Sequence, residues 1–148
     1  MPGAVYGPGD HSELGAQLDQ ARRGKLLFKA LADVGVNAVH VDDVPAGLLL
    51  VHDRGRLGES YVLGGEITTL SELIDRVSPK PVRLTIPTLL LEAMIPAGPL
   101  IGKAMGTGPN LRELISASAG VTYWATDAKA RGELGYEPRD LEAGLKRV

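Results

Sequence analysis

Hydrophobic and polar residues follow two kinds of pattern along this chain. Short segments with alternating or β-branched apolar residues predict strands at residues 4–6, 25–28, 37–41, 60–65, 66–69, 82–86 and 121–124. Segments with apolar residues three and four positions apart predict helices at residues 10–23, 43–54, 70–77, 110–120, 128–134 and 141–147. This mixture of strands and helices predicts the α/β class.

The segment 37–47 shows the clearest passage from a strand into a helix. Val39 and Val41 alternate with polar neighbours, which predicts a strand with one buried face. Asp43 stands where the helix begins, so its carboxylate is placed to accept hydrogen bonds from the free N–H groups of the first turn. We interpret Asp43 as a structural cap, because an aspartate at such a position caps a helix more often than it catalyses.

Capping signals mark most of the other helix boundaries. Small polar residues precede several helical patterns, and a glycine follows one of them. The residues concerned are Asp10 or Ser12, Thr69 or Ser71, Asn110, Asp140 and, past a helix end, Gly135. Thr69 with Glu72 also has the spacing of a capping box. The sequence therefore predicts where these helices start and stop as well as where they lie.

The most apolar stretch, residues 88–105, is not a membrane span. Glu92, the Pro96–Pro99 break and Lys103 leave no uninterrupted apolar run of the roughly 20 residues that cross a bilayer. Two short helices or one kinked helix fit better. Weak association with a membrane surface, or contact with an apolar substrate, is the alternative to plain packing.

Composition limits the protein class further. The 148 residues, 44% of them hydrophobic, are enough for one domain with a core. A net charge of -2, from 16 basic and 18 acidic residues without a long block of either sign, gives no electrostatic footprint for nucleic acid. Nucleic acid is therefore not an expected partner.

Neither a metal centre nor export is indicated. The sequence has no cysteine and three scattered histidines, so it offers neither a disulfide framework nor metal-ligand spacing. The first residues lack the basic and apolar regions of a signal peptide. We expect a cytoplasmic protein without a bound metal.

Motifs alone reveal no active site. The sequence contains no glycine-rich dinucleotide loop, P-loop or nucleophile elbow, and no tyrosine is followed by a lysine four residues later. The four tyrosines, Tyr6, Tyr61, Tyr123 and Tyr136, lie in or beside apolar runs. Packing is the favoured interpretation for all four.

Four segments in order, however, resemble a known family. They cover residues 2–10, 37–44, 58–65 and 126–138, and include Tyr6-Gly7-Pro8-Gly9, Val41-Asp42-Asp43-Val44 and Leu134-Gly135-Tyr136-Glu137-Pro138. Together they resemble the C-terminal half of an extended short-chain dehydrogenase/reductase, closest to the dihydroflavonol-reductase-like and hopanoid-associated epimerase branch. The resemblance implies the last cofactor-side strand of a Rossmann-type sheet plus the small α/β substrate-binding lobe, forming one partial domain over residues 1–148.

The same resemblance implies a role for the first residues. Pro2, Gly3 and Val5 match backbone that contacts the nicotinamide end of an NAD or NADP cofactor, and Tyr6 lies beside it. The family's glycine-rich loop and Tyr–Lys catalytic pair lie N-terminal to the matched region. We therefore expect no catalytic residue in this chain, no tight binding of the cofactor by the chain alone, and no sheet partner for the strand at 4–6.

Other residues match the substrate lobe. The resemblance makes His11, Asn37 and His40 substrate-lobe candidates and places Asp43 at the strand–helix junction, in agreement with a cap. Nucleotide-sugar epimerases that resemble this stretch carry a phosphate-binding arginine where this chain has Val36. This difference favours a small apolar or sugar-like carbonyl or alcohol substrate over one with a bulky diphosphate.

Two function classes follow from these observations. The first is the substrate-binding part of an NAD(P)-dependent oxidoreductase or epimerase that acts with a complementary N-terminal half. The second is a non-catalytic binding module that retains this lobe and forms a homodimer. An upstream reading frame that encodes the missing motifs would favour the first class.

Overall fold

A computed structural model describes residues 1–87, 90 and 122–146 of the chain. Its main sheet has three strands in the order β1-β3-β4: β1 (Ala4–Tyr6), β3 (Gly35–His40) and β4 (Glu66–Thr69). β1 pairs with β3 in parallel, and β4 pairs with β3 antiparallel. A separate parallel pair joins β2 (Lys29–Ala30) to β5 (Thr85–Ile86).

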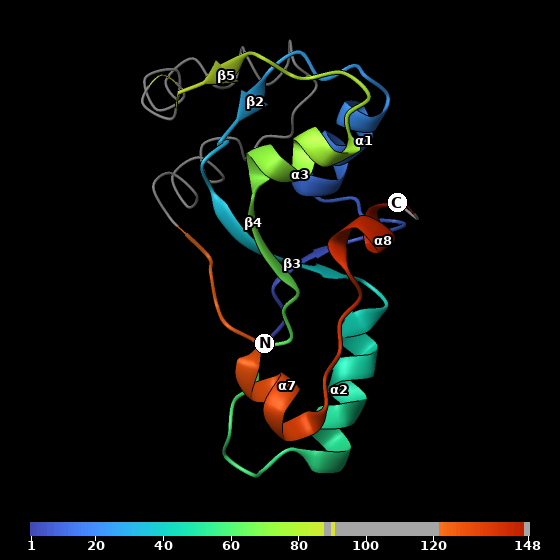
Figure 1. Ribbon diagram of the computed structural model, residues 1–148, viewed down its shortest axis with the longest axis vertical. Coiled ribbons are helices and arrows are strands. Elements are labelled where there is room, and N and C mark those ends of the chain that lie inside the picture. The colour runs from blue at the N-terminus through green and yellow to red at the C-terminus, as the bar shows by residue number, and fades with distance from the viewer. Residues whose placement is uncertain (88–89, 91–121, 147–148) are drawn as a thin grey trace.

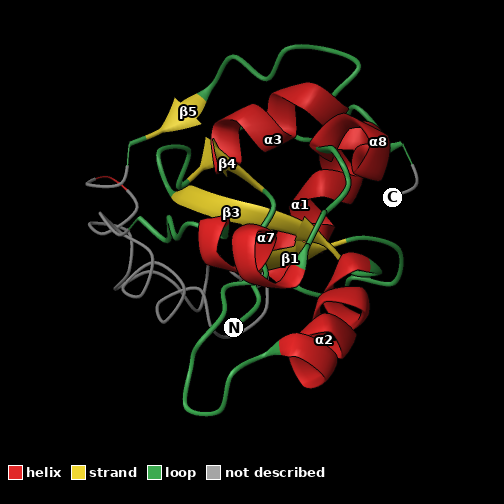
Figure 2. Cartoon of the chain, turned by 60° about the horizontal axis from the view of Figure 1, so that its bottom comes forward, coloured by secondary structure: helices red, strands yellow, loops and turns green. Residues whose placement is uncertain are grey.

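Helices gather at two ends of the molecule (Figure 1). At one end lie α1 (Glu13–Arg22), α3 (Leu70–Val77) and α8 (Leu141–Leu145), and at the other α2 (Asp43–Arg54) packs beside α7 (Ala128–Leu134). Figure 2 shows the three-stranded sheet between these two groups. No helix in the described ranges is long and apolar enough to cross a membrane.

Three apolar clusters hold these elements together. The first joins the sheet to α1, α3 and α8, and its buried members are Tyr6, Leu18, Val36, Ala38, Leu73, Leu141 and Leu145. The second, made of Ala21, Leu31, Leu70 and Ile74, packs α1 against α3. The third, made of Tyr61, Leu63, Ala130, Leu134 and Tyr136, lies beside α2 and α7.

Local capping signals predicted the helix boundaries well. The Ser12 hydroxyl accepts a hydrogen bond from the Gly15 N–H, and Thr69 with Glu72 forms the complete capping box. Gly135 ends α7 with a φ of 70°, the left-handed conformation that glycine adopts without strain. Asp140 is the N-cap of α8, although its side chain makes no capping hydrogen bond.

Several of the strand predictions need correction. β1 does have a partner, because residues 4–6 pair with residues 38–40 of β3. β3 is buried at all six positions rather than on one face, since the first cluster covers one face and the Ala125 carbonyl approaches Asn37 on the other. The strand predicted at 25–28 is replaced by β2 at 29–30.

The predicted strand at 60–65 is also wrong. Only Leu63 makes a strand-like bridge, to Pro2, and the chain then turns into β4. A Cβ on Gly64 would lie 2.3 Å from the Asn37 amide nitrogen, so the glycine allows the chain to pass against Asn37 instead of extending the strand. The predictions for 110–120 and for nearly all of 88–105 concern residues outside the described ranges.

Candidate functional site

The four segments that carry the family resemblance meet around one part of the sheet. We call this region the strand junction and define it as residues 1–7, 35–43 and 61–66, against which residues 125–140 pack. The Gly3 N–H donates to the Leu63 carbonyl at 3.1 Å, and the Leu63 N–H donates to the Met1 carbonyl at 2.8 Å. A Cβ on Gly3 would lie 2.2 Å from the Asn37 carbonyl oxygen, so only glycine fits here.

Asn37 holds three parts of the junction together. Its side chain is 1% exposed. The amide oxygen accepts from the Gly65 N–H at 2.7 Å, and the amide nitrogen donates to the Ala125 carbonyl. Because both polar groups bind backbone, the structure gives Asn37 an anchoring role, and its contact with a substrate stays a prediction.

Tyr6 and His40 pack against each other beneath the junction. Their rings meet edge to face, with centroids 5.4 Å apart, and both side chains are almost fully buried. Burial, with a smaller contribution from the Asp43 charge, raises the pKa of Tyr6 to about 12, which keeps its hydroxyl protonated at neutral pH. The His40 Nδ1 accepts from the Asp42 N–H at 3.2 Å, and the Asp42 carboxylate lies 3.5 Å from the same nitrogen.

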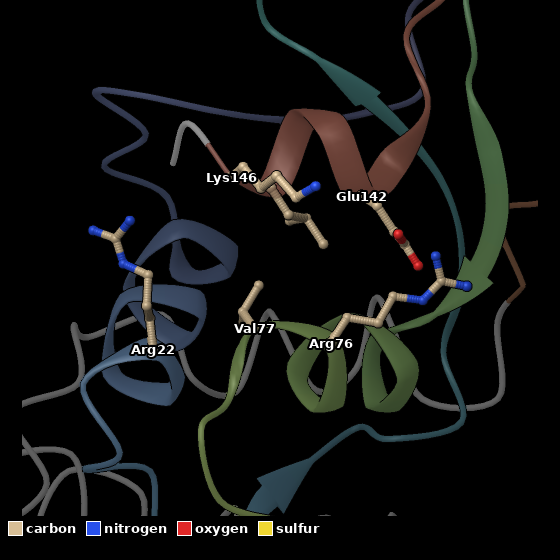
Figure 3. Close-up of a pocket in the computed structure, with 6 residues that line it drawn as sticks. Arg22, Arg76, Val77, Glu142 and Lys146 are labelled. Carbon is tan, nitrogen blue, oxygen red and sulfur yellow. The ribbon is translucent and has the colours of Figure 1, made fainter.

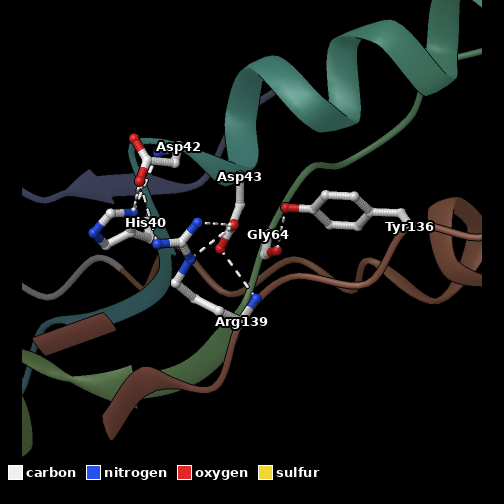
Figure 4. A network of polar contacts seen from close by, with 6 residues as sticks. All are labelled: His40, Asp42, Asp43, Gly64, Tyr136 and Arg139. Atoms are coloured by element: carbon white, nitrogen blue, oxygen red, sulfur yellow. Dashed lines mark hydrogen bonds and ion pairs between the residues drawn. The ribbon is translucent and has the colours of Figure 1, made fainter. Parts of the chain in front are cut away.

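The prediction that Asp43 caps α2 is wrong, because its carboxylate binds other groups. Asp42 is the N-cap of α2 and makes no side-chain capping bond, while Asp43 is the first residue of the helix. The Asp43 carboxylate instead accepts from the Arg139 Nε at 2.9 Å and from the Arg139 N–H at 3.0 Å. Asp43 thus holds the start of α2 by binding a residue 96 positions later in the chain (Figure 4).

Arg139 connects both aspartates of the junction. Besides its contacts with Asp43, its Nη1 lies 3.3 Å from the Asp42 carboxylate. Burial alone would lower the pKa of Arg139, but the hydrogen bonds and charges of the two aspartates outweigh burial and raise it. No sequence signal indicated this role for Arg139, because nothing local reveals a partner that lies so far along the chain.

Tyr136 secures the segment that leads to Arg139. Its hydroxyl donates to the Gly64 carbonyl at 2.9 Å, and its side chain is 2% exposed. Burial, followed by the Asp43 charge, raises the pKa of Tyr136 to about 12. The packing role predicted for this tyrosine is therefore accompanied by a specific hydrogen bond (Figure 4).

The other predicted site residues, Pro2, Val5 and His11, are exposed at the surface. Pro2 is exposed and Val5 is 36% exposed, and both lie on the outer side of the three-stranded sheet, where β1 is an edge strand within the described part of the chain. His11 is exposed just before α1. The structure therefore joins Gly3 to Asn37 and Tyr6 to His40, and leaves His11 outside these contacts.

The chain is similar to several solved structures, and some of these are named as sugar-nucleotide epimerases. It aligns with gox2253 at a TM-score of 0.76 and 28% identity, over 99% of this chain and 46% of that one. It aligns with PA4631, a nucleoside-diphosphate-sugar epimerase from Pseudomonas aeruginosa, at a TM-score of 0.72 and 24% identity, over 99% of this chain and 44% of that one. It aligns with UDP-glucose 4-epimerase from Thermotoga maritima at a TM-score of 0.61 and 22% identity, over 98% of this chain and 42% of that one.

These likenesses confirm the predicted fold class. The chain is α/β and spans less than half the length of the solved structures that it matches. That coverage agrees with the C-terminal half of an extended short-chain dehydrogenase/reductase. No protein-family model and no curated protein sequence matches the chain.

Proposed function

We propose that this chain, which has the fold of the C-terminal part of an extended short-chain dehydrogenase/reductase, is the substrate-binding portion of an NAD(P)-dependent oxidoreductase or epimerase. The observation that carries the proposal is the strand junction itself. Segments that lie far apart in the sequence and resemble the family bond directly to one another there, through Gly3 with Leu63, Asn37 with Gly65, and Tyr136 with Gly64. Such convergence fits one functional site better than four chance similarities.

The chain supplies only one end of the cofactor site in this proposal. Pro2 and Val5 are exposed beside the outer edge of β1, and Gly3 lies between them with its N–H bonded to the Leu63 carbonyl. In the proposal, the backbone of these three residues borders a nicotinamide ring. Bound NAD or NADP would supply the hydride chemistry. The pyrophosphate site and the proton-transfer residues would come from a complementary dinucleotide-binding half, because the chain contains neither a glycine-rich loop nor a Tyr–Lys pair.

The substrate proposal rests on Val36. This residue is 9% exposed and belongs to the first apolar cluster with Tyr6 and Leu18. It brings no positive charge to a position where a sugar-nucleotide enzyme would need one for phosphate. A small apolar or sugar-like carbonyl or alcohol therefore suits the lobe better than a sugar diphosphate.

Titration of the purified chain with NADH and with NADPH tests this proposal. We expect no saturable binding up to about 1 mM, because a nicotinamide contact alone supplies little affinity. The reading frame directly upstream of the Met1 codon is expected to encode a glycine-rich loop and a Tyr–Lys pair. Tight binding of the intact cofactor to the chain alone would overturn the assignment of the pyrophosphate site to another half.

The exposed edge of β1 also supports a second function. An edge strand with free backbone groups can pair with another copy of the chain. A non-catalytic module of this kind would dimerise and would need no dinucleotide-binding half. Sedimentation over a range of concentrations distinguishes the two functions, since only the second predicts a self-association equilibrium that involves β1.

A further inference from the structure

A hollow of about 400 Å³ lies between α1, α3 and α8. Six residues line it (Figure 3): Arg22 from α1, Arg76 and Val77 from α3, and Glu142, Leu145 and Lys146 from α8 and its C-terminal end. Its volume is within the range of small-molecule sites. Neither the family resemblance nor the proposed function assigns a role to these six residues.

Positive charge is in excess around this hollow. Arg76 already pairs with Glu66 at 2.6 Å, and Glu142 stands on the same side of the hollow. Among the residues that the structure describes, Arg22 and Lys146 have no ion-pair partner. Two cations from different helices are therefore available for an anion.

The base of the hollow is apolar. Leu145 is 8% exposed and belongs to the first apolar cluster, against which Val77 also packs. A ligand that fits must combine charge with an apolar part. Because cations approach from separate helices, a tetrahedral phosphate, which offers oxygen atoms in several directions, suits them better than a planar carboxylate.

We propose that this hollow binds an organic phosphate, with the phosphate between Arg22 and Lys146 and the carbon portion against Val77 and Leu145. The proposal is independent of the proposed function, because residues of this chain form the whole site. Phenyl phosphate is a suitable probe. Inorganic phosphate lacks its apolar part, and benzyl alcohol lacks its charge.

Titrations followed by amide chemical shifts test the proposal on the full chain. We expect saturable binding of phenyl phosphate with shifts concentrated in α1, α3 and α8, and weaker binding at higher salt because screening reduces charge attraction. The double variant Arg22→Gln, Lys146→Gln should bind about tenfold more weakly, since two charge-assisted contacts are lost. Arg23→Gln is the matched control, because Arg23 pairs with Asp19 and does not line the hollow.

Each result of these titrations either supports or overturns the proposed phosphate site. Binding that weakens in the double variant but not in Arg23→Gln supports the site. Equal affinity in the double variant, no saturable binding, or shifts confined to other elements would overturn it. Inorganic phosphate or benzyl alcohol binding as tightly as phenyl phosphate would also contradict it, because the proposed ligand needs both parts.

Discussion

Arg139 is the residue on which the strand junction depends most directly. It binds the carboxylate of Asp43, a residue that is 8% exposed, through its side chain and its own N–H. Arg139→Ala leaves that buried carboxylate with only the backbone donor, so we expect a loss of about 3 kcal/mol in the free energy of unfolding. Urea denaturation measures the change. Arg23→Ala, which breaks an exposed pair with Asp19, should cost about 0.5 kcal/mol, and an equal loss in both variants would contradict the assignment.

Gly144 gives a second test at the residue scale. A Cβ there would lie 2.1 Å from the Tyr6 hydroxyl oxygen, whereas nothing lies within 4 Å of a Cβ on Gly132. Gly132→Ala should stabilise α7 by up to about 1 kcal/mol through helix propensity. Gly144→Ala should instead destabilise the protein by about 1–3 kcal/mol through the clash. Adding Tyr6→Phe should restore part of this loss, and absence of any restoration would contradict the predicted contact.

Tyrosine ionisation predicts how stability changes in alkali. The pKa of Tyr6 and of Tyr136 is about 12 in the folded protein, against an ordinary value of 10.0. Below pH 10 both tyrosine hydroxyls are protonated in the folded protein and in the unfolded chain, so their contribution to the free energy of unfolding is fully present. As the pH rises from 10 towards 12 the unfolded chain loses them first, and the folded state loses stability. Denaturation at pH 9, 10 and 11 should show a shallower decline in the Tyr6→Phe, Tyr136→Phe double variant than in the parent, and equal declines would refute the prediction.

At the scale of elements, the capping box makes α3 a sensitive point. The Glu72 N–H donates to the Thr69 hydroxyl, and the Glu72 carboxylate accepts from the Thr69 N–H. Thr69→Ala should therefore cost about 1 kcal/mol, and Thr69→Ser should retain most of the stability. Asp140→Ala is the control, because Asp140 occupies an N-cap without a capping bond and should cost clearly less. Thermal unfolding of the three variants measures the order.

Helix boundaries were predictable because the interactions that set them are local. Ser12 lies three residues from its partner, as does Thr69, and Gly135 acts through its own backbone conformation. The strands were harder, because their pairing joins distant residues. The segment 60–65 has a good strand pattern, yet only Leu63 forms a bridge, to Pro2, and the chain then passes against Asn37 at Gly64.

The candidate site divides in the same way. The family resemblance assigned Tyr6 to the cofactor side and Asn37 and His40 to the substrate lobe. The structure places Tyr6 against His40 and bonds Asn37 to Gly65, and the predicted ligand contacts of these residues stay predictions. The chemistry of each contact was not accessible from the sequence. Asp43 looks like a cap when only its neighbours are considered, and the competing partner Arg139 becomes visible only once the chain has folded.

At the scale of the whole molecule, β1 determines what the chain can join. The Tyr6 carbonyl accepts from the Val41 N–H, so the backbone of Val5, the preceding residue in the ladder, points to the other side of the strand. Val5 lies at the edge of the three-stranded sheet in the described part of the chain and is 36% exposed. Its N–H is therefore the group that reports whether another strand pairs with β1.

Hydrogen exchange at the Val5 amide distinguishes the two proposed functions. In the chain alone we expect this amide to exchange much faster than the Tyr6 amide, which faces β3. The comparison sample is the chain produced together with the sequence encoded upstream of its Met1 codon. In that longer protein a strand of the dinucleotide-binding half should cover the edge of β1, so the Val5 amide should exchange slowly at every protein concentration. A self-associating module would instead show protection that rises with the concentration of the chain alone, because pairing between copies depends on mass action. Fast exchange of Val5 in the longer protein would contradict an enzyme assembled across this edge.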